Sequence, residues 1–386
     1  TEHLCTLQME LIPNFNLDYW TLLFVLLCLF AAIQLFYTFQ FYARWAFYKK
    51  KQNTNQQALP PVSVIIAARN ESDNLYENLP HILCQDYPDF EVIVVNNQSI
   101  DDSNWILIAF ARQFPRLKVV ELSKSPHLRP GKKLPITLAI KAAKHEHFVL
   151  TDADCKPASS SWLKDMMSAT AYHQELVIGY SPFSKEKGFL NRLVRYDNTW
   201  MSASSFAYAL GNMAYKANGR NLAYSKQLFQ KTNGFKNHYA LIPGDDDLFL
   251  NDAIRYTKPA LCTEPSAFVN AHAPKTWSAW LRQKSKHHAT AARYSFIKRL
   301  LLGIYPSSVL LLWISFVALL FNKAFLPLNA GIFLGTLVIK WWLQGRGLNK
   351  LGERKLALFF PFWDLLHSIL MPVIYYISER QKYYRW

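Results

Sequence analysis

The sequence lacks the motifs that define several large classes of enzyme. Its five cysteines include no C-x-x-C pair, so neither a disulfide framework nor a zinc site is indicated. It contains no G-x-x-x-x-G-K-[ST], and no G-x-G-x-x-G follows the first predicted strand, which disfavours nucleotide hydrolases and dinucleotide dehydrogenases. Two histidine pairs, His145 with His147 and His287 with His288, lack partners at metal-ligand spacing, and we interpret them as solvated or core residues.

Acidic residues are also in deficit, with 27 Asp and Glu against 43 Lys and Arg and a formal net charge of +16. Much of the basic charge lies near apolar segments and is interleaved with Trp and Tyr. This pattern favours an anionic lipid surface over a nucleic-acid groove, so we expect a membrane partner and no nucleic acid. A basic, non-catalytic module that binds the membrane surface is an alternative of a different class.

Long apolar runs occur only toward the two ends of the sequence. Each has close to the roughly 20 residues that a helix needs to cross a bilayer. We therefore predict an integral membrane protein with about four transmembrane or membrane-embedded helices. The predicted segments are a short extracytoplasmic N-terminus (1–16), a signal anchor (17–42), a C-terminal transmembrane region (300–377, with runs at 300–321, 324–343 and 356–377) and a basic tail (378–386).

Charge flanking the first run predicts its orientation. Acidic residues precede it and Arg44, Lys49 and Lys50 follow it, so the positive-inside rule places the middle of the chain in the cytosol, and we expect a bacterial inner (plasma) membrane. The last run contains Asp364 and His367, which leaves open whether it spans the membrane or is re-entrant.

The middle of the chain, residues 52–275, has the mixed polarity of a soluble domain. Continuous apolar strands are predicted at 62–68, 90–95, 117–122 and 148–151, alternating with helices at 72–84, 102–114 and 133–144. This alternation predicts an α/β fold with a mostly parallel sheet covered by helices on both faces. Such sheets bind ligands at the carboxyl ends of their strands, where the polar clusters 69–71, 96–99 and 152–154 fall.

Two aspartates, Asp152 and Asp154, end the fourth predicted strand. Burying bare carboxylates costs several kcal/mol or more, so a metal ion, or a polyphosphate held by one, is expected beside them. The alternative is that Asp154 caps the helix after Pro157. Lys132 and Lys133 begin another predicted helix, where they oppose its dipole, so they either face a phosphate or belong to a basic loop.

The order of these motifs carries a family resemblance. The segments 67–71 (AARNE), 131–133 (GKK), 152–154 (DAD) and 244–246 (GDD) resemble glycosyltransferase family 2, with the GT-A fold, over roughly residues 60–295. That family includes ceramide glucosyltransferase and the hyaluronan, chitin and cellulose synthases. The resemblance implies a Rossmann-like, mostly parallel sheet.

The resemblance also implies a role for each motif in binding a nucleotide sugar. Asp154, with Asp152, would hold Mn²⁺ or Mg²⁺, and Lys132 and Lys133 would face the diphosphate. The family usually has aspartate where this chain has Asn97, and Asn offers both a donor and an acceptor to the base. A UDP-sugar is the favoured donor. The nucleotide-sugar residues implied are Ala67, Arg69, Glu71, Asn97, Lys132, Lys133 and Asp152.

Three successive aspartates, Asp245, Asp246 and Asp247, indicate a second acidic site. Because they repel one another, at least one is expected to have a raised pKa, which suits a general base. They also stand at a predicted helix start, where acids are favoured. The resemblance assigns the base to Asp246, with Asp245 and Asp247 as alternatives.

The segment 276–299 is predicted to be an amphipathic helix at the membrane surface. Here the family has Q-x-x-R-W, in which the arginine meets the pyrophosphate and the tryptophan stacks on the acceptor sugar. This chain has Gln283, Lys286 and His287 at those positions. Lys286 keeps the positive charge of the arginine but not its bidentate fork, and His287 has a smaller ring than tryptophan.

Together these expectations describe an inverting, metal-dependent glycosyltransferase at the cytosolic face of a membrane. About four membrane segments make a private pore for a long polysaccharide hard to build. We therefore expect a lipid or lipid-linked glycan acceptor rather than a growing polymer. A processive polysaccharide synthase that acts as an oligomer is the alternative.

Overall fold

The computed structural model describes residues 18–49, 59–123, 131–169 and 175–380, with side chains to residue 377. The predicted extracytoplasmic N-terminus (1–16) lies outside the described residues, as does residue 381 onward of the predicted basic tail. The chain divides into two compact units. We call them the helical unit (residues up to 48 and 295–377) and the α/β unit (residues 49–294).

The α/β unit is built on a sheet whose described strands run in the order β3-β2-β1-β4-β7-β6-β8. Strands β1 to β4 are mutually parallel, whereas β7 is antiparallel to both β4 and β6. The predicted mostly parallel α/β fold is therefore confirmed, and the predicted strands are present. The strands are β1 (Val62–Ala68), β2 (Phe90–Asn97), β3 (Leu117–Leu122), β4 (His147–Thr151), β6 (Leu176–Gly179), β7 (Leu222–Ser225) and β8 (Ala260–Cys262).

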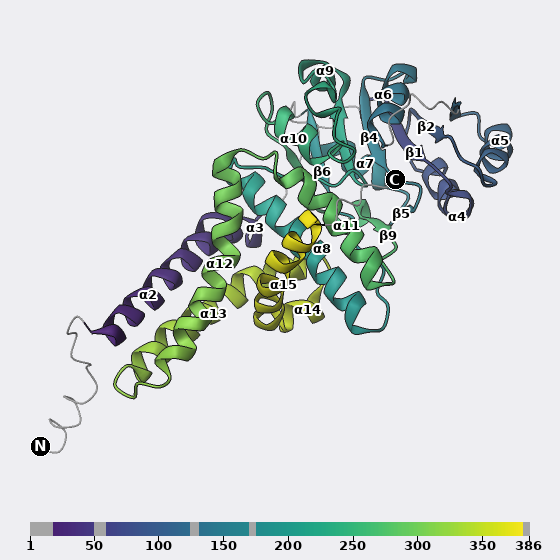
Figure 1. Cartoon of the computed structure of the whole chain (residues 1–386). Helices are drawn as coiled ribbons and strands as arrows, with labels where there is room; N and C mark the ends of the chain where they lie inside the picture. The colour runs from purple at the N-terminus through teal and green to yellow at the C-terminus, as the bar shows by residue number, and fades with distance from the viewer. Residues whose placement is uncertain (1–17, 50–58, 124–130, 170–174, 381–386) are drawn as a thin grey trace, which may run out of the picture. The chain divides into compact units, whose positions relative to one another are not determined.

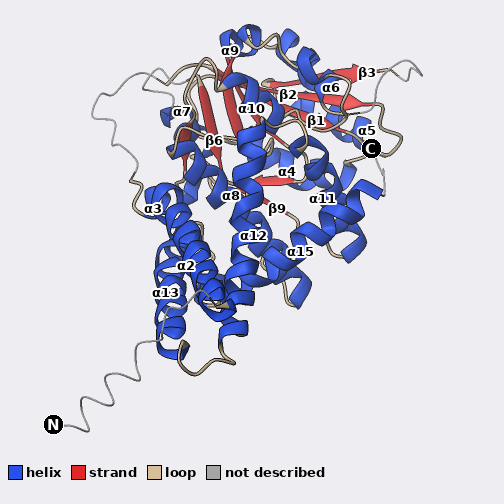
Figure 2. Ribbon diagram, turned by 60° about the vertical axis from the view of Figure 1, so that its left-hand side comes forward, coloured by secondary structure: helices blue, strands red, loops and turns tan. Residues whose placement is uncertain are grey.

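Helices flank this sheet (Figure 2). Helix α6 packs against β1, β2 and β3, and α5 packs against β3. The strand interiors are apolar and almost fully buried, as expected for a sheet with helices on its faces. The helices are α4 (Ser72–Leu83), α5 (Ser103–Gln113), α6 (Lys133–Ala142), α7 (Trp162–Ser168), α8 (Phe189–Leu210), α9 (Lys226–Lys231), α10 (Asp247–Ala253) and α11 (Trp277–Ala291). A small antiparallel sheet pairs β5 (Cys155–Pro157) with β9 (Val269–Ala271).

The strand order brings the predicted polar clusters to one edge of the sheet. Because β1 lies between β2 and β4, the segments that follow these three strands are neighbours. The backbone N–H of Asn70 donates to the Ser99 hydroxyl (2.9 Å), and its side chain accepts from the backbone N–H of Ile100 (2.8 Å). The convergence predicted from parallel strand ends is thus present.

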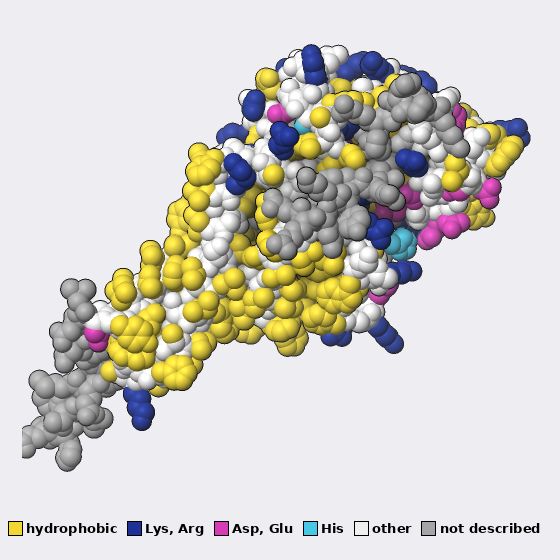
Figure 3. Space-filling view, viewed as in Figure 1, with side chains coloured by type: hydrophobic (Ala, Val, Ile, Leu, Met, Phe, Trp, Pro, Cys, Tyr) yellow, Lys and Arg dark blue, Asp and Glu magenta, His cyan; other side chains and the backbone are white. Residues whose placement is uncertain are grey.

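Among its described residues, the helical unit contains four helices that are long and apolar enough to cross a membrane, one N-terminal and three C-terminal, as predicted. Helices α2, α12 and α13 lie side by side (Figure 1). Hydrophobic side chains cover much of the surface that these helices expose (Figure 3). The helices are α2 (Tyr19–Tyr37), continued by a π-helical turn (Thr38–Tyr42) and α3 (Ala43–Ala46), then α12 (Phe296–Leu319), α13 (Leu326–Lys350), α14 (Arg354–Leu358) and α15 (Phe360–Arg380).

The predicted interfacial segment 276–299 is divided between two helices. Helix α11 ends at Ala291 in the α/β unit, and α12 begins at Phe296 in the helical unit. The residues of the predicted Q-x-x-K-H motif all lie on α11, so they belong to the α/β unit.

Candidate active site

A lysine and an aspartate meet at the carboxyl end of β4. The Lys132 ammonium lies 2.5 Å from the Asp152 carboxylate. Burial alone would raise the pKa of Asp152, but Lys132 lowers it, and the carboxylate is ionised at neutral pH. Burial lowers the pKa of Lys132, and the Asp152 and Asp245 carboxylates more than reverse this. Lys132 therefore supplies a counter-charge to Asp152 from within the protein, and the metal ion expected beside the two aspartates stays a prediction.

Asp154 lies beside this ion pair and does not cap the next helix. The N-cap of α7 is Ser161, so the capping alternative for Asp154 is excluded. Within the described residues, its carboxylate accepts a hydrogen bond from the Cys155 thiol (3.3 Å). Burial raises the pKa of Glu71, and the charges of Asp154 and Asp152 add to that shift. Three acidic side chains that follow two strands, Glu71, Asp152 and Asp154, are thus near enough to interact electrostatically with one another and with Lys132.

These carboxylates suit a hard divalent ion. Mg²⁺ and Mn²⁺ prefer oxygen ligands, and Mg²⁺ commonly takes one or two carboxylates from the protein and the remainder from substrate phosphates and water. Within the described ranges, no group of three His, Cys, Asp or Glu side chains is arranged to hold a metal by itself. Asp152 and Asp154 therefore fit an ion that a phosphate ligand completes.

The other predicted nucleotide residues also lie at these strand ends. Ala67 is buried near the end of β1, and Asn97 is buried as the last residue of β2. Arg69 follows β1 and is partly exposed. The structure brings their backbone positions together with Glu71, and their contact with a nucleotide stays a prediction.

Lys133 has a different position from Lys132. Its buried ammonium donates to the backbone carbonyls of His238 (2.6 Å), Leu241 (2.8 Å) and Pro243 (2.8 Å). Three acceptors satisfy all three ammonium protons. Lys133 thereby fixes the loop that leads to Asp245, and Lys132 is the lysine that faces the carboxylates.

Gly131 allows the two loops of the site to pack closely, and Gly244 allows the turn that leads into α10. Gly131 has φ +126°, and an added Cβ would lie 3.2 Å from the carbonyl oxygen of Ile242. Gly244 has φ +98°, and a Cβ there would lie within 2.6 Å of Leu248. Both backbone conformations favour glycine. The GKK and GDD motifs are therefore parts of one packed structure.

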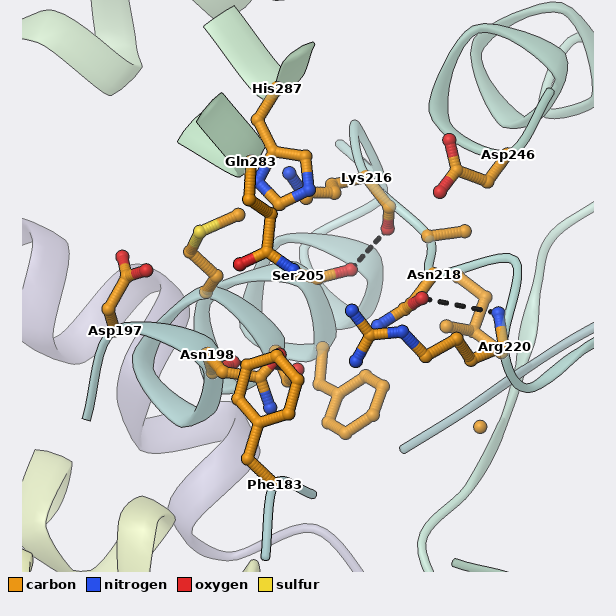
Figure 4. A pocket seen from close by; sticks show the side chains of 16 residues that line it. Phe183, Asp197, Asn198, Ser205, Lys216, Asn218, Arg220, Asp246, Gln283 and His287 are labelled. Carbon is orange, nitrogen blue, oxygen red and sulfur yellow. Dashed lines mark hydrogen bonds between the residues drawn. The ribbon is translucent and has the colours of Figure 1, made fainter. Parts of the chain in front are cut away.

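Asp246, the predicted general base, is held by backbone hydrogen bonds and lines a pocket. Its carboxylate accepts from the backbone N–H groups of Asp247 (2.7 Å) and Gly219 (3.2 Å), which hold it at the start of α10. It also lines a pocket in the α/β unit (Figure 4). The same side chain thus caps a helix and faces a cavity, so the two interpretations of the acidic triplet are compatible.

The neighbouring aspartates have other surroundings. Burial, together with the Asp246 charge, raises the pKa of Asp245 to about 7, and Lys132 opposes this shift. Burial and Asp246 raise the pKa of Asp247 to about 6. Asp247 accepts hydrogen bonds from the hydroxyls of Thr290 (2.5 Å) and Tyr294 (2.6 Å), and neither Asp245 nor Asp247 lines the pocket. Asp246 is the member of the triplet that faces it.

Helix α11 contributes the three residues of the predicted Q-x-x-K-H motif. Gln283 and His287, one turn apart, both line the pocket that contains Asp246. Burial lowers the pKa of Lys286, and repulsion from Lys132 lowers it further, so Lys286 lies near enough to Lys132 to interact with it electrostatically. The helix therefore faces both acidic sites.

An ion pair that the sequence did not reveal anchors α11. Lys284 pairs with Asp197 of α8, and both side chains are almost fully buried. The Trp280 indole N–H also approaches the Asp197 carboxylate (3.4 Å). The two helices are 87 residues apart at this contact, and no local spacing could have indicated it.

The pocket has further polar side chains that sequence reasoning did not assign. Asn198 and Ser205 come from α8, and Lys216, Asn218 and Arg220 come from the segment that precedes β7. This segment includes the residues G-R-N (219–221). Its Asn221, however, is buried and bonds to Tyr180, Ala267 and Trp162, so it has a structural role.

Comparison with known proteins agrees with this geometry. Residues 63–242 match the family described as Glycosyl transferase family 2. The chain is 24% identical over 243 residues to a probable glycosyltransferase, YdaM, of Bacillus subtilis, covering 61% of this chain and 56% of that protein. It is 31% identical over 125 residues to beta-monoglucosyldiacylglycerol synthase of Trichormus variabilis, covering 32% of this chain and 25% of that protein.

A solved structure is similar over nearly the whole chain. The mannosyltransferase PcManGT of Pyrobaculum calidifontis, in complex with GDP-Man and Mn²⁺, aligns with a TM-score of 0.54 and 20% identity, covering 89% of this chain and 99% of that one. At this identity the likeness shows the fold. The chain is thus similar to the Glycosyl transferase family 2 model over residues 63–242, and its α/β unit has a fold of the GT-A type.

Proposed function

We propose that this protein transfers a sugar, with inversion, from a nucleotide-sugar donor to a hydroxyl of a lipid or lipid-linked acceptor at a membrane surface. The position of Asp246 carries the proposal. Its carboxylate lines a pocket and is oriented by two backbone N–H groups, and Asp245 next to it interacts electrostatically with Lys132 and Asp152. A proton acceptor therefore lies next to a site suited to a diphosphate.

The donor half of the reaction is assigned to the strand ends. Lys132 would bind the donor diphosphate, while Ala67, Arg69, Glu71 and Asn97 would border the nucleoside. Asp152 and Asp154 would hold Mg²⁺ or Mn²⁺, which when bound stabilises the negative charge of the departing diphosphate. The similar mannosyltransferase was solved with GDP-Man and Mn²⁺, which supports a nucleotide-sugar donor and a divalent ion.

The acceptor half is assigned to the pocket. The acceptor oxygen attacks the anomeric carbon while Asp246 takes its proton. The bond from that carbon to the diphosphate oxygen breaks, and the nucleoside diphosphate leaves. General-base catalysis of this kind contributes about 10²–10⁴-fold in rate.

A lipid or lipid-linked acceptor is favoured by the helical unit. Its four apolar helices are suited to a membrane, and the similar beta-monoglucosyldiacylglycerol synthase is named for a lipid product. Incubating the membrane-reconstituted chain with a labelled donor should give a discrete product in the lipid extract. A size ladder of sugar polymer would instead support the processive alternative.

Asp246→Asn tests the proposed base. We expect transfer to fall about 10²–10⁴-fold, because Asn keeps the shape and cannot accept the proton. Binding of the donor nucleotide with Mn²⁺, measured by thermal shift with a panel of UDP- and GDP-sugars, should be retained. Asp154→Ala should instead weaken metal-dependent nucleotide binding. Asp73→Asn, which changes an exposed carboxylate on α4, is the control, and unchanged turnover in Asp246→Asn would refute the assignment.

A further inference from the structure

In the pocket that Asp246 lines, the positively charged side chains outnumber the carboxylates that are free to balance them. Two cationic side chains, Lys216 and Arg220, line it together with two acidic ones, Asp197 and Asp246. Asp197 is already paired with Lys284. Asp246 is therefore the one lining carboxylate, among the described residues, that is not in an ion pair.

Arg220 presents an unused donor to this pocket. Its Nη1 is buried and has no hydrogen-bond partner among the described residues. The guanidinium lies over the Phe183 ring, 4.7 Å from its centroid, and points into the group of lining side chains (Figure 4). A guanidinium fixed over a ring offers its planar fork to an oxyanion.

Lys216 and His287 add two more groups without partners. In the described part of the chain, the Lys216 ammonium has no hydrogen bond or ion pair, although its backbone carbonyl accepts from Ser205. Burial lowers the pKa of Lys216, and the charges of Asp247 and Asp246 oppose this shift only in part. The buried Nδ1 of His287 also has no partner, and burial and the nearby Lys216 lower the pKa of its ring, which is neutral.

An acceptor that fills the pocket must compensate these groups. When it enters, remaining water leaves, and a neutral acceptor would bury a cation without a partner, which is costly. A phosphate ester supplies several acceptor oxygens in a tetrahedral arrangement. Several oxygens on one phosphate can accept hydrogen bonds from the Arg220 guanidinium, the Lys216 ammonium and the His287 ring at the same time.

We propose that the acceptor carries a phosphate ester next to the hydroxyl that attacks, and that Arg220 and Lys216 bind this phosphate while Asp246 faces the hydroxyl. The inference rests on the proposed function, because it assigns the substrate class of the same pocket. The headgroup of an anionic lipid has this chemistry. The donor's own diphosphate is the other source of phosphate, and the experiment distinguishes the two.

The test titrates the detergent-solubilised full chain, in the presence of Mn²⁺ and a saturating nucleoside diphosphate, with glycerol 3-phosphate and with glycerol as the neutral matched probe. Binding is followed by intrinsic tryptophan fluorescence and thermal shift. We expect saturable binding of glycerol 3-phosphate and none of glycerol. Arg220→Gln and Lys216→Gln should each weaken this binding at least tenfold, and Arg220→Lys should have a smaller effect, because it keeps the charge and loses the fork.

The control is Lys187→Gln, which removes an exposed lysine and should change nothing. Equal binding of the two probes, no binding of either, or phosphate binding that survives both substitutions would overturn the inference. Binding seen only without the nucleoside diphosphate would assign Arg220 and Lys216 to the donor, which also overturns it. Nucleotide binding is measured on the same samples, so failure of the phosphate probe alone leaves the proposed function standing.

Discussion

Among the described residues, each unit of this protein contains a lysine–aspartate ion pair that is almost fully buried, and these two pairs have different neighbours. In the α/β unit, Lys284 of α11 meets Asp197 of α8. In the helical unit, the Lys340 ammonium of α13 lies 2.8 Å from the Asp364 carboxylate of α15. All four side chains are almost fully buried. Asp197 borders the candidate acceptor pocket, whereas Asp364 lies in a helix suited to a membrane.

The Lys340–Asp364 pair of the helical unit belongs to a network of buried polar side chains. The Tyr305 hydroxyl of α12 is within hydrogen-bond distance of Asp364 (3.0 Å) and Gln344 (2.9 Å), and Gln344 donates to Thr38 in the π-helical turn after α2. The network therefore connects four helical segments that are far apart in sequence. It also explains how an acidic residue is tolerated in the last apolar run, because polar groups inside a membrane need partners.

The comparison teaches that one type of buried pair can serve two purposes. A buried pair is weak evidence for stability, because desolvation offsets much of the attraction, but removing one partner is costly. In the helical unit, removing one partner would destabilise the packing of the helices against one another. In the α/β unit, removing one partner would also change the position of α11, whose Gln283 and His287 line the pocket.

Breaking the pair in the helical unit should have the largest effect on stability. Asp364→Ala leaves Lys340 charged and unpaired, and we expect a loss of about 3–5 kcal/mol in the free energy of unfolding. Thermal unfolding in detergent measures it. The double variant Lys340→Met, Asp364→Leu should recover most of the loss, and nucleotide binding per folded molecule should be unchanged. A loss below about 1 kcal/mol would contradict this account.

Asp247, a buried carboxylate that accepts hydrogen bonds from two hydroxyls, sharpens the comparison. The raised pKa of Asp247, about 6, means that the folded state binds a proton more tightly than the unfolded state. Its contribution to stability is therefore full below about pH 4 and is lost as the pH rises through about 6, a change of up to roughly 3 kcal/mol. Relative to Asp247→Asn, the wild type should lose thermal stability between pH 4 and pH 7. Parallel pH profiles of the two proteins would show that Asp247 does not titrate in this range.

Breaking the pair in the α/β unit should change transfer more specifically. In Asp197→Asn, α11 loses its charged anchor, and small displacements of positioned groups cost roughly 10- to 100-fold in rate. We expect the KM for the acceptor to rise and the KM for the donor to stay the same. If both constants rise together, or neither changes, Asp197 does not act through the acceptor pocket. Lys231→Gln, which removes an ammonium from the more exposed Lys231–Glu175 pair, is the control.

The residues that sequence reasoning found share a physical origin. Asp152, Glu71 and Asn97 follow or end apolar runs, and the carboxyl ends of parallel strands meet at one edge, so their proximity could be predicted without knowing any side-chain contact. Asp246 was predicted from the repulsion within the acidic triplet and from a family motif. The roles of Lys133 and Asp197 could not be predicted, because their partners are distant backbone carbonyls and a distant lysine.

By itself, the sequence determined the alternation of strands and helices, the apolar segments and the strand ends that carry acids, because these depend on local periodicity and length. The tertiary structure decided which charges meet. In the folded chain, Lys132 forms an ion pair with Asp152, whereas Lys133 donates to the backbone of the loop before Asp245. Of the three successive aspartates, Asp246 is the one that lines the pocket. Such choices depend on contacts between segments tens of residues apart, where burial and charge act through space and not along the chain.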